Sequence, residues 1–175
     1  MTNHLGDLVT IIVVSYNHER YISQCLESIE KQTLRPSRVI ILDDRSSDSS
    51  VQIAERFADA SDLNATVIPH RFNVGLCRTL NEALDMVDTK YYAYISADDY
   101  MMPTRLERQL KLFETLPDDY AVVYSDAWRE NGDMERLPAR FSEFYRWKPR
   151  AERVGDVFLT VLESAWIPAP SALVR

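Results

Sequence analysis

Two pairs of adjacent aspartates are the residues of this sequence best suited to chemistry. Asp43-Asp44 and Asp98-Asp99 each follow an apolar, strand-like run. Adjacent carboxylates repel each other unless water or a cation neutralises them. Carboxylate oxygens are the ligands that hard ions such as Mg²⁺ and Mn²⁺ prefer. Two such pairs at strand ends therefore predict one oxygen-lined site for a divalent ion and a polar ligand.

The polar ligand that suits these residues carries phosphate groups and a nucleobase. One carboxylate of Asp98-Asp99 would bind the ion, and its neighbour would hold a ligand hydroxyl. Asp44 could accept a hydrogen bond from a nucleobase N–H, and the ring of Tyr16 could stack on that base. Plainer alternatives stay open: a solvated turn for the late pair, a charged loop around Asp44, and a packed rim aromatic for Tyr16.

The basic and nucleophilic residues carry weaker signals. Arg71 and Arg78 are candidates for holding phosphate charge, although surface arginines are common. His18 and His70 are single histidines in predicted loops, where solvation is expected. The sequence has four glycines and lacks a glycine-rich phosphate loop of the dinucleotide or P-loop type. No serine or cysteine lies in a nucleophile–base constellation.

Strand-like and helix-like segments alternate along the chain. Strands are predicted at 9–14, 39–42, 65–68, 91–95 and 120–124, and amphipathic helices at 22–29, 51–58, 76–87 and 103–113. This alternation predicts an α/β domain with a mainly parallel sheet flanked by helices. In such folds ligands bind beyond the carboxyl ends of the strands, which is where both acidic pairs and Asp126 fall.

Helix-start residues and the region after residue 126 complete the prediction. Asn17 and Asp48 are expected to cap helices, and Pro103 is expected at the first position of the fourth helix. Residues 127–150 are expected to form a segment without regular secondary structure, and residues 154–162 are expected to form a short helix. Cys25 and Cys77 both fall at apolar helical positions, which predicts two buried free thiols.

Composition limits the classes of function. The 175 residues are 46% hydrophobic and 27% charged, with a formal net charge of −7, which is typical of one soluble globular domain. The acidic balance and the lack of a basic stripe argue against nucleic acid as a partner. No stretch has the length of a transmembrane helix and no signal peptide is evident, so a cytoplasmic location is expected.

Several segments, in this order, resemble the family 2 glycosyltransferases of the GT-A fold. The matching segments are VTIIVVSYN at 9–17, LESIEKQT at 26–33, VIILDDRSSD at 39–48, NVG at 73–75 with Asn81, YISADD at 94–99 and PTRLERQ at 103–109. The match covers roughly residues 8 to 126. It implies a Rossmann-like GT-A domain that binds a nucleotide-diphospho-sugar donor.

The resemblance also implies residue roles. Tyr16 would lie against the nucleobase, Asp44 would hydrogen-bond it, and Asp98 would contact the ribose region. Asp99 would bind Mn²⁺ or Mg²⁺, which neutralises the departing diphosphate. With Arg71 as a phosphate ligand, these are the candidate substrate-binding and metal-binding residues. Transfer to an acceptor hydroxyl would proceed with inversion through an oxocarbenium-like transition state.

The catalytic base of the family, an acidic residue in a Glu-Asp type motif, is expected beyond Arg175. Because the chain stops within an apolar strand-like run, residues 1–175 are interpreted as one GT-A domain truncated at the C-terminus. Its donor-binding half spans 8–126, and its acceptor half begins at 127–175 and is incomplete. This fragment is expected to bind donor with little turnover. Exposed apolar surface at the end of the chain could also favour a homo-dimer.

The expected acceptor is a saccharide or a lipid-linked acceptor, as in polysaccharide biosynthesis, with peripheral association at the inner face of the membrane left open. Two other functions also stay open. A phosphoacceptor receiver-like signalling domain places aspartates at strand ends as well, but its acidic pair follows the first strand, where this chain has Ser15-Tyr16-Asn17. An inactive nucleotide-sugar binding module would differ in lacking the catalytic base.

Overall fold

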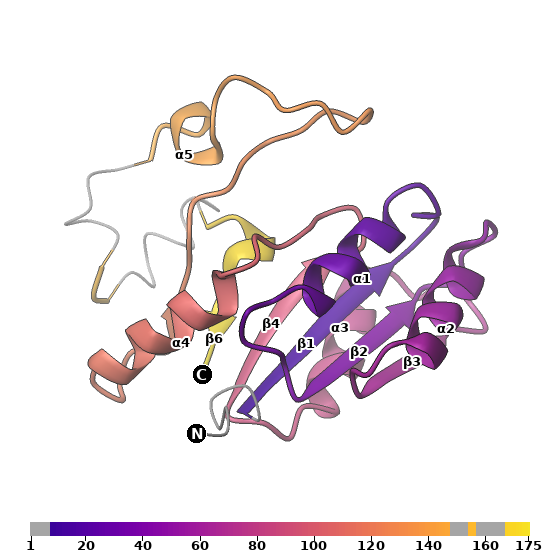
Figure 1. The fold of residues 1–175 in the computed structure, drawn as a ribbon, viewed down its shortest axis with the longest axis horizontal. Coiled ribbons are helices and arrows are strands. Elements are labelled where there is room, and N and C mark those ends of the chain that lie inside the picture. Colours follow the sequence, from indigo (N-terminus) through magenta and orange to yellow (C-terminus); the bar gives the residue numbers. More distant parts are fainter. Residues whose placement is uncertain (1–7, 148–153, 157–166) are drawn as a thin grey trace.

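The computed structural model describes residues 8–147, 154–156 and 167–175. A six-stranded sheet in the order β3-β2-β1-β4-β6-β5 carries helices on both faces (Figure 1). Its strands are β1 (Val9–Ser15), β2 (Arg38–Asp43), β3 (Ala65–Pro69), β4 (Tyr91–Ser96), β5 (Val122–Val123) and β6 (Leu173–Val174). Strands β1 to β4 run parallel, and β6 runs antiparallel to β4 and β5. The predicted α/β domain with a mainly parallel sheet is confirmed.

The helices divide between the two faces of the sheet. They are α1 (Ile22–Glu30), α2 (Ser50–Ala60), α3 (Leu76–Asp85), α4 (Arg105–Thr115) and the short α5 (Phe141–Phe144), with a 3-10 turn at Ala169–Ser171. Helices α1, α2 and α4 contribute to the larger apolar cluster on one face, and α3 packs on the other face. The segment that carries α5 arches away from the sheet (Figure 1).

Strand β1 lies at the centre of the sheet because its uninterrupted apolar run needs cover on both faces. All seven of its residues are buried. Ile11 and Val13 pack in the cluster that includes Phe113 of α4, whereas Ile12 and Val14 pack against α3. This alternation follows from the two-residue period of a strand. Fully burying an isoleucine contributes about 1.5–3 kcal/mol, so β1 anchors the fold.

The register of the sheet sets the position of the site. Ser15 of β1 is level with Asp43 of β2, and Val14 is level with Ser96 of β4. The three strands are parallel and end at nearly the same level. The loops that follow them therefore meet at one edge of the sheet.

Several predicted element boundaries are wrong for identifiable reasons. Helix α1 begins at Ile22, because Asn17 has a φ of 56° and its side chain accepts a hydrogen bond from the Ser47 N–H instead of capping a helix. Helix α4 begins at Arg105 after Thr104, two residues beyond Pro103. Asp48 precedes the N-cap residue of α2, Ser49, although its carboxylate still accepts the Ser50 N–H at 3.0 Å.

The C-terminal third follows the prediction in outline. The fifth predicted strand, 120–124, is reduced to β5. Residues 127–147 are irregular as expected, apart from α5 and an isolated bridge between Glu130 and Arg136. Residues 154–156 form a bend, and the rest of the short helix predicted at 154–162 lies outside the described residues.

The two cysteines differ in exposure, and the end of the chain is covered. Cys25 of α1 is fully buried, as predicted, but Cys77 is exposed. The prediction for Cys77 is wrong because α3 turns Thr79 and Ala83 inward, and residue 77 points to another side of that helix. Leu173 is fully buried between β4 and β5, so the apolar run at the end of the chain lends no support to a homo-dimer. Among the described residues, no helix has the length and apolar character needed to cross a membrane.

Candidate functional site

Tyr16 lies at the centre of the carboxyl edge of the sheet. On one side the Asp44 N–H donates to the Ser15 carbonyl at 2.8 Å, and on the other the Ala97 N–H donates to the Val14 carbonyl at 2.9 Å. The Tyr16 loop is therefore flanked by the loop after β2 and the loop after β4. The Tyr16 residue is 49% exposed, so its ring is available to a ligand.

The loops after β1 and β2 are joined by hydrogen bonds. The Asn17 N–H donates to Ser46 Oγ at 2.8 Å, and Asn17 Oδ1 accepts the Ser47 N–H at 2.9 Å. Asp48 accepts the Glu19 N–H at 3.0 Å. These contacts join residues about 30 positions apart in the sequence. They hold the backbone next to Tyr16 in one position relative to Asp44.

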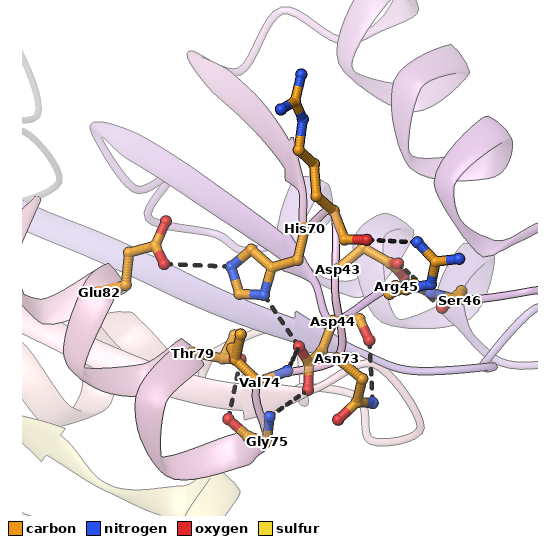
Figure 2. Close-up of polar contacts among 11 residues, drawn as sticks. Asp43, Asp44, Arg45, Ser46, His70, Asn73, Val74, Gly75, Thr79 and Glu82 are labelled. Atoms are coloured by element: carbon orange, nitrogen blue, oxygen red, sulfur yellow. Dashed lines mark hydrogen bonds and ion pairs between the residues drawn. The ribbon is translucent and has the colours of Figure 1, made fainter.

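Asp44 is buried, and its carboxylate accepts several hydrogen bonds from the protein (Figure 2). Its Oδ1 accepts hydrogen bonds from His70 Nδ1 at 3.0 Å and the Val74 N–H at 2.7 Å, and its Oδ2 accepts the Gly75 N–H at 2.8 Å. Burial, the largest single influence, favours a higher pKa for Asp44, but the hydrogen bonds from His70, Val74 and Gly75 together outweigh it and lower that pKa. Asp44 is therefore an ionised acceptor at neutral pH.

Gly75 and His70 complete the surroundings of Asp44. Gly75 has a φ of 84°, which residues with a side chain rarely adopt, and it is the N-cap residue of α3, with its N–H directed at Asp44. The expectation that His70 is solvated is wrong, because its side chain is only 9% exposed. The sequence held one signal for this burial, since His70 directly follows a strand that ends beside β2.

The late acidic pair occupies the far side of the Tyr16 loop. The Asp98 side chain is 50% exposed, and its Oδ2 lies 3.9 Å from His18 Nε2. Burial and repulsion by Asp98 raise the pKa of Asp99 to about 6, although Arg105 acts in the opposite direction. His18 thus belongs to this edge, a position that the expectation of solvation missed. Its signal in the sequence was its place two residues after Tyr16.

Arg105 is the cation that offsets the acidic pair from within the protein. Burial lowers its pKa to about 10, and the charge of Asp99 limits this shift. The Arg105 guanidinium donates to the Ala172 carbonyl at 3.0 Å, so it is fixed at the start of α4. Arg105 does not outweigh the burial of Asp99 and the repulsion by Asp98, so the pKa of Asp99 stays raised.

The acidic pair fits a divalent ion that shares its ligands with a phosphate. Among the residues that the structure describes, no group of three or more His, Cys, Asp and Glu forms a metal site built from protein alone. Mg²⁺ and ions like it are commonly held by one or two carboxylates together with substrate phosphates and water. Asp99 would hold such an ion, because a cation at this position relieves the unfavourable charge that the structure shows.

A cavity of about 840 Å³ opens beside the acidic pair. Its lining includes Asp98, Asp99, Arg105, Trp128 and Ser171, with further residues from the 124–140 segment. This volume lies within the range of small-molecule sites. Tyr16 and Asp44 are not part of the lining, so the nucleobase side of the predicted site and the cavity meet at Asp98.

Three further candidates are placed less favourably for direct chemistry. Asp126, the remaining strand-end aspartate, accepts the Ser142 N–H at 3.0 Å and the Ser142 hydroxyl at 2.6 Å, which fixes it to α5. Arg71 lies exposed in the loop between β3 and α3, and its carbonyl accepts a hydrogen bond from Arg45. Arg78 is also exposed, on α3. Neither Arg71 nor Arg78 lines the cavity, so a phosphate role for either stays a prediction.

Comparison with known proteins agrees with this architecture. The chain belongs to glycosyl transferase family 2, whose family model matches residues 10–162. The amylovoran biosynthesis glycosyltransferase AmsE of Erwinia amylovora is 29% identical over 149 residues, which cover 80% of this chain and 54% of AmsE. The chain spans 16% to 42% of the length of three other curated relatives that it matches. The match gives no support to a phosphoacceptor signalling domain.

Solved structures share the fold at low sequence identity. Staphylococcus aureus TarS 1-349 in complex with UDP-GlcNAc gives a TM-score of 0.69 at 21% identity, over 95% of this chain and 45% of that chain. The Pyrobaculum calidifontis mannosyltransferase PcManGT in complex with GDP-Man and Mn²⁺ gives 0.66 at 21% identity, over 96% of this chain and 44% of that chain. The predicted GT-A fold is therefore confirmed.

Proposed function

We propose that the chain is the donor-binding part of an enzyme that transfers a sugar from a nucleotide-diphospho-sugar to an acceptor hydroxyl. One observation carries this proposal: the ends of β2, β1 and β4 bring Asp44, Tyr16 and the Asp98-Asp99 pair to a single edge of the sheet. The ring of Tyr16 and the ionised Asp44 suit the nucleobase of such a donor, and the Asp98-Asp99 pair suits its ribose and its metal-bound diphosphate.

Each residue has a role that its surroundings support. The half-exposed ring of Tyr16 would stack on the nucleobase. Asp44, held ionised by its donors, would accept a hydrogen bond from a base N–H. Asp98 has a half-exposed carboxylate and would accept hydrogen bonds from the ribose hydroxyls. Arg71 would contribute positive charge toward the phosphates from the loop after β3.

Asp99 would hold Mn²⁺ or Mg²⁺ together with the donor diphosphate. Such an ion, when bound, supplies positive charge that stabilises the diphosphate as a leaving group. The PcManGT complex holds Mn²⁺ together with GDP-Man, which supports this part of the proposal. In this chain Asp99 would bind the ion and orient it toward the diphosphate. The buried guanidinium of Arg105 limits the repulsion within the acidic pair.

The transfer step would use the cavity next to Asp98. An acceptor hydroxyl there would attack the anomeric carbon as the bond to the diphosphate oxygen breaks, and attack from the opposite side inverts the configuration. A base takes the hydroxyl proton, and that base is expected beyond Arg175. We therefore propose that residues 8–126 bind donor, that residues 127–175 begin the acceptor half, and that residues 1–175 turn donor over slowly.

The wider assignment is a polysaccharide-synthesising enzyme that acts on a saccharide or lipid-linked acceptor on the cytoplasmic side of a membrane. The name of AmsE, with its reference to amylovoran biosynthesis, supports this assignment. An inactive nucleotide-sugar binding module is the second candidate, since residues 1–175 contain no Glu-Asp dipeptide. Both candidates require donor binding at the same edge of the sheet.

Thermal unfolding with nucleotides tests donor binding. UDP, GDP, UDP-GlcNAc and GDP-mannose would each be added at millimolar concentration, with Mn²⁺ or with EDTA. A ligand at 100 times its Kd adds about 2.7 kcal/mol to the free energy of unfolding, which raises the Tm of a domain of this size by about 5 °C or more. We expect such a rise with Mn²⁺ for at least one ligand. No rise with any of the four would refute the proposal.

A further inference from the structure

A chain of three side chains lies behind the proposed nucleobase contact. His70 Nδ1 is 3.0 Å from Asp44 Oδ1, and His70 Nε2 is 3.3 Å from Glu82 Oε2 on α3. Figure 2 shows the His70 ring between the two carboxylates. The ring and Asp44 are buried, whereas the Glu82 side chain is 50% exposed. The roles proposed above use Asp44 alone and leave His70 and Glu82 without a function.

The hydrogen-bond inventory of Asp44 shows what His70 contributes. An ionised carboxylate offers about four acceptor positions. His70 and Val74 use two on Oδ1, and Gly75 uses one on Oδ2. The remaining position on Oδ2 is the one that a nucleobase N–H could use. Among the described residues, the donors to this carboxylate are two backbone N–H groups and one side chain, that of His70.

His70 is itself held through both its backbone and its ring. Its N–H donates to the Asp43 carbonyl at 2.8 Å, which continues the pairing of β3 with β2 beyond Pro69. Because the ionised Asp44 can only accept, the ring must carry a proton on Nδ1. Rotation of the ring would break its hydrogen bond with Asp44. The imidazole is therefore a fixed donor, set by groups on β2 and α3.

We propose that His70 is a positioning residue for nucleotide recognition, which fixes the Asp44 carboxylate so that its last acceptor position on Oδ2 stays available to a nucleobase N–H. The Glu82 carboxylate faces the other ring nitrogen, Nε2, at 3.3 Å and acts through the ring as a neighbouring negative charge. This inference rests on the proposed function, because it requires a nucleotide at Asp44. It goes further in naming the groups that select the base.

The arrangement selects bases by donor pattern. An acceptor-only carboxylate favours uracil, with its N3–H, or guanine, with its N1–H, and disfavours cytosine, whose N3 is an acceptor. Losing the His70 donor leaves Oδ1 with the Val74 N–H alone, which gives the carboxylate more freedom to shift. That freedom weakens binding of the favoured base more than binding of cytosine. The ratio of the two affinities therefore reports positioning, which a change in stability alone would not alter.

Calorimetric titration of this chain with UDP, GDP and CDP in the presence of Mn²⁺ tests the proposal. A hydrogen bond to a charged group has a value that corresponds to about a tenfold change in affinity. We expect His70→Leu to weaken the tighter of UDP and GDP about tenfold and to reduce its preference over CDP by a similar factor. His70→Asn keeps an N–H near the position of Nδ1, so it should stay within about threefold of the wild type.

Matched variants separate positioning from stability. Ala83→Gly weakens the same helix, α3, at a fully buried position without removing a polar group, so it should lower the Tm and leave the UDP to CDP or GDP to CDP ratio unchanged. If His70→Leu kept the wild-type ratio of affinities, or if Ala83→Gly reduced that ratio as much as His70→Leu does, the role of His70 would be refuted while the proposed function would stand. Should the wild type bind neither UDP nor GDP, the proposed function falls with it.

Glu82→Gln carries the test if His70→Leu does not fold, because Glu82 is half exposed and its replacement leaves the core intact. We expect this variant to weaken the favoured nucleotide about two- to threefold, with a matching fall in its preference over CDP. A ratio identical to that of the wild type would overturn the inference.

Discussion

Replacing Asp99 by Asn should stabilise the metal-free protein at pH 8. Asp99 has a pKa raised to about 6 from an ordinary value of 3.8. A pKa that is raised in the folded state means that folding favours the protonated Asp99. The protonated group therefore stabilises the folded protein below about pH 4, and this stabilisation is lost as the pH rises through 6. Asn resembles the protonated carboxyl and cannot ionise, so Asp99→Asn avoids this loss.

The size of the effect follows from the pKa shift. The difference between about 6 and 3.8 is 2.2, and each pKa unit corresponds to 1.36 kcal/mol, so the gain at pH 8 is at most about 3 kcal/mol. For a domain of this size each kcal/mol raises the Tm by roughly 2–4 °C. A rise of about 5 °C is therefore a realistic expectation. At pH 4 the two proteins should have nearly the same Tm.

Thermal unfolding in EDTA from pH 4 to pH 8 measures this difference. Asp62→Asn is the matched control, since it removes the same charge from an exposed loop at the opposite end of the strands and should leave the pH dependence unchanged. In Mn²⁺ with the stabilising nucleotide the order should reverse, because only the wild type has the carboxylate proposed to bind the metal. If Asp99→Asn lowered the Tm at pH 8 in EDTA, the electrostatic account of this site would be wrong.

Three other outcomes are expected. Tyr16→Ala should weaken nucleoside diphosphate binding at least fivefold in calorimetry, because base stacking is lost, and should leave the Tm within about 1 °C; equal affinity would contradict the stacking role. Phe113→Ala should lower the urea-derived free energy of unfolding by about 3–5 kcal/mol, while Leu112→Ala, at an exposed position of the same helix, should change it by less than about 1 kcal/mol. A thiol reagent should react with Cys77 alone in the native state and with Cys25 also after unfolding, because burial raises the pKa of Cys25 and hides its Sγ. Rapid reaction of both cysteines in the native protein would contradict the packing of α1.

The fold and the edge that carries the site were predictable from local patterns. Uninterrupted β-branched runs such as Val9–Val14 suit a strand buried on both faces, and the residues that follow such a strand must lie at its carboxyl end. Tyr16, Asp44 and the Asp98-Asp99 pair were placed at one edge on this basis, and the register of β1 with β2 and β4 agrees. Element boundaries were less predictable. Asn17, for example, was expected to cap a helix, but its side chain accepts a hydrogen bond from the Ser47 N–H instead.

Local patterns were enough to predict the succession of strands and helices along the chain, the acidic edge and the family, because these depend on periodicity and on short segments. Which groups surround each carboxylate depends on how distant parts of the chain pack together. Asp44 meets His70, Val74 and Gly75 across 26 to 31 residues of sequence. The pKa of Asp99 depends on burial by such distant segments. Local patterns do not encode these contacts, since chain packing alone brings the partners within hydrogen-bond distance.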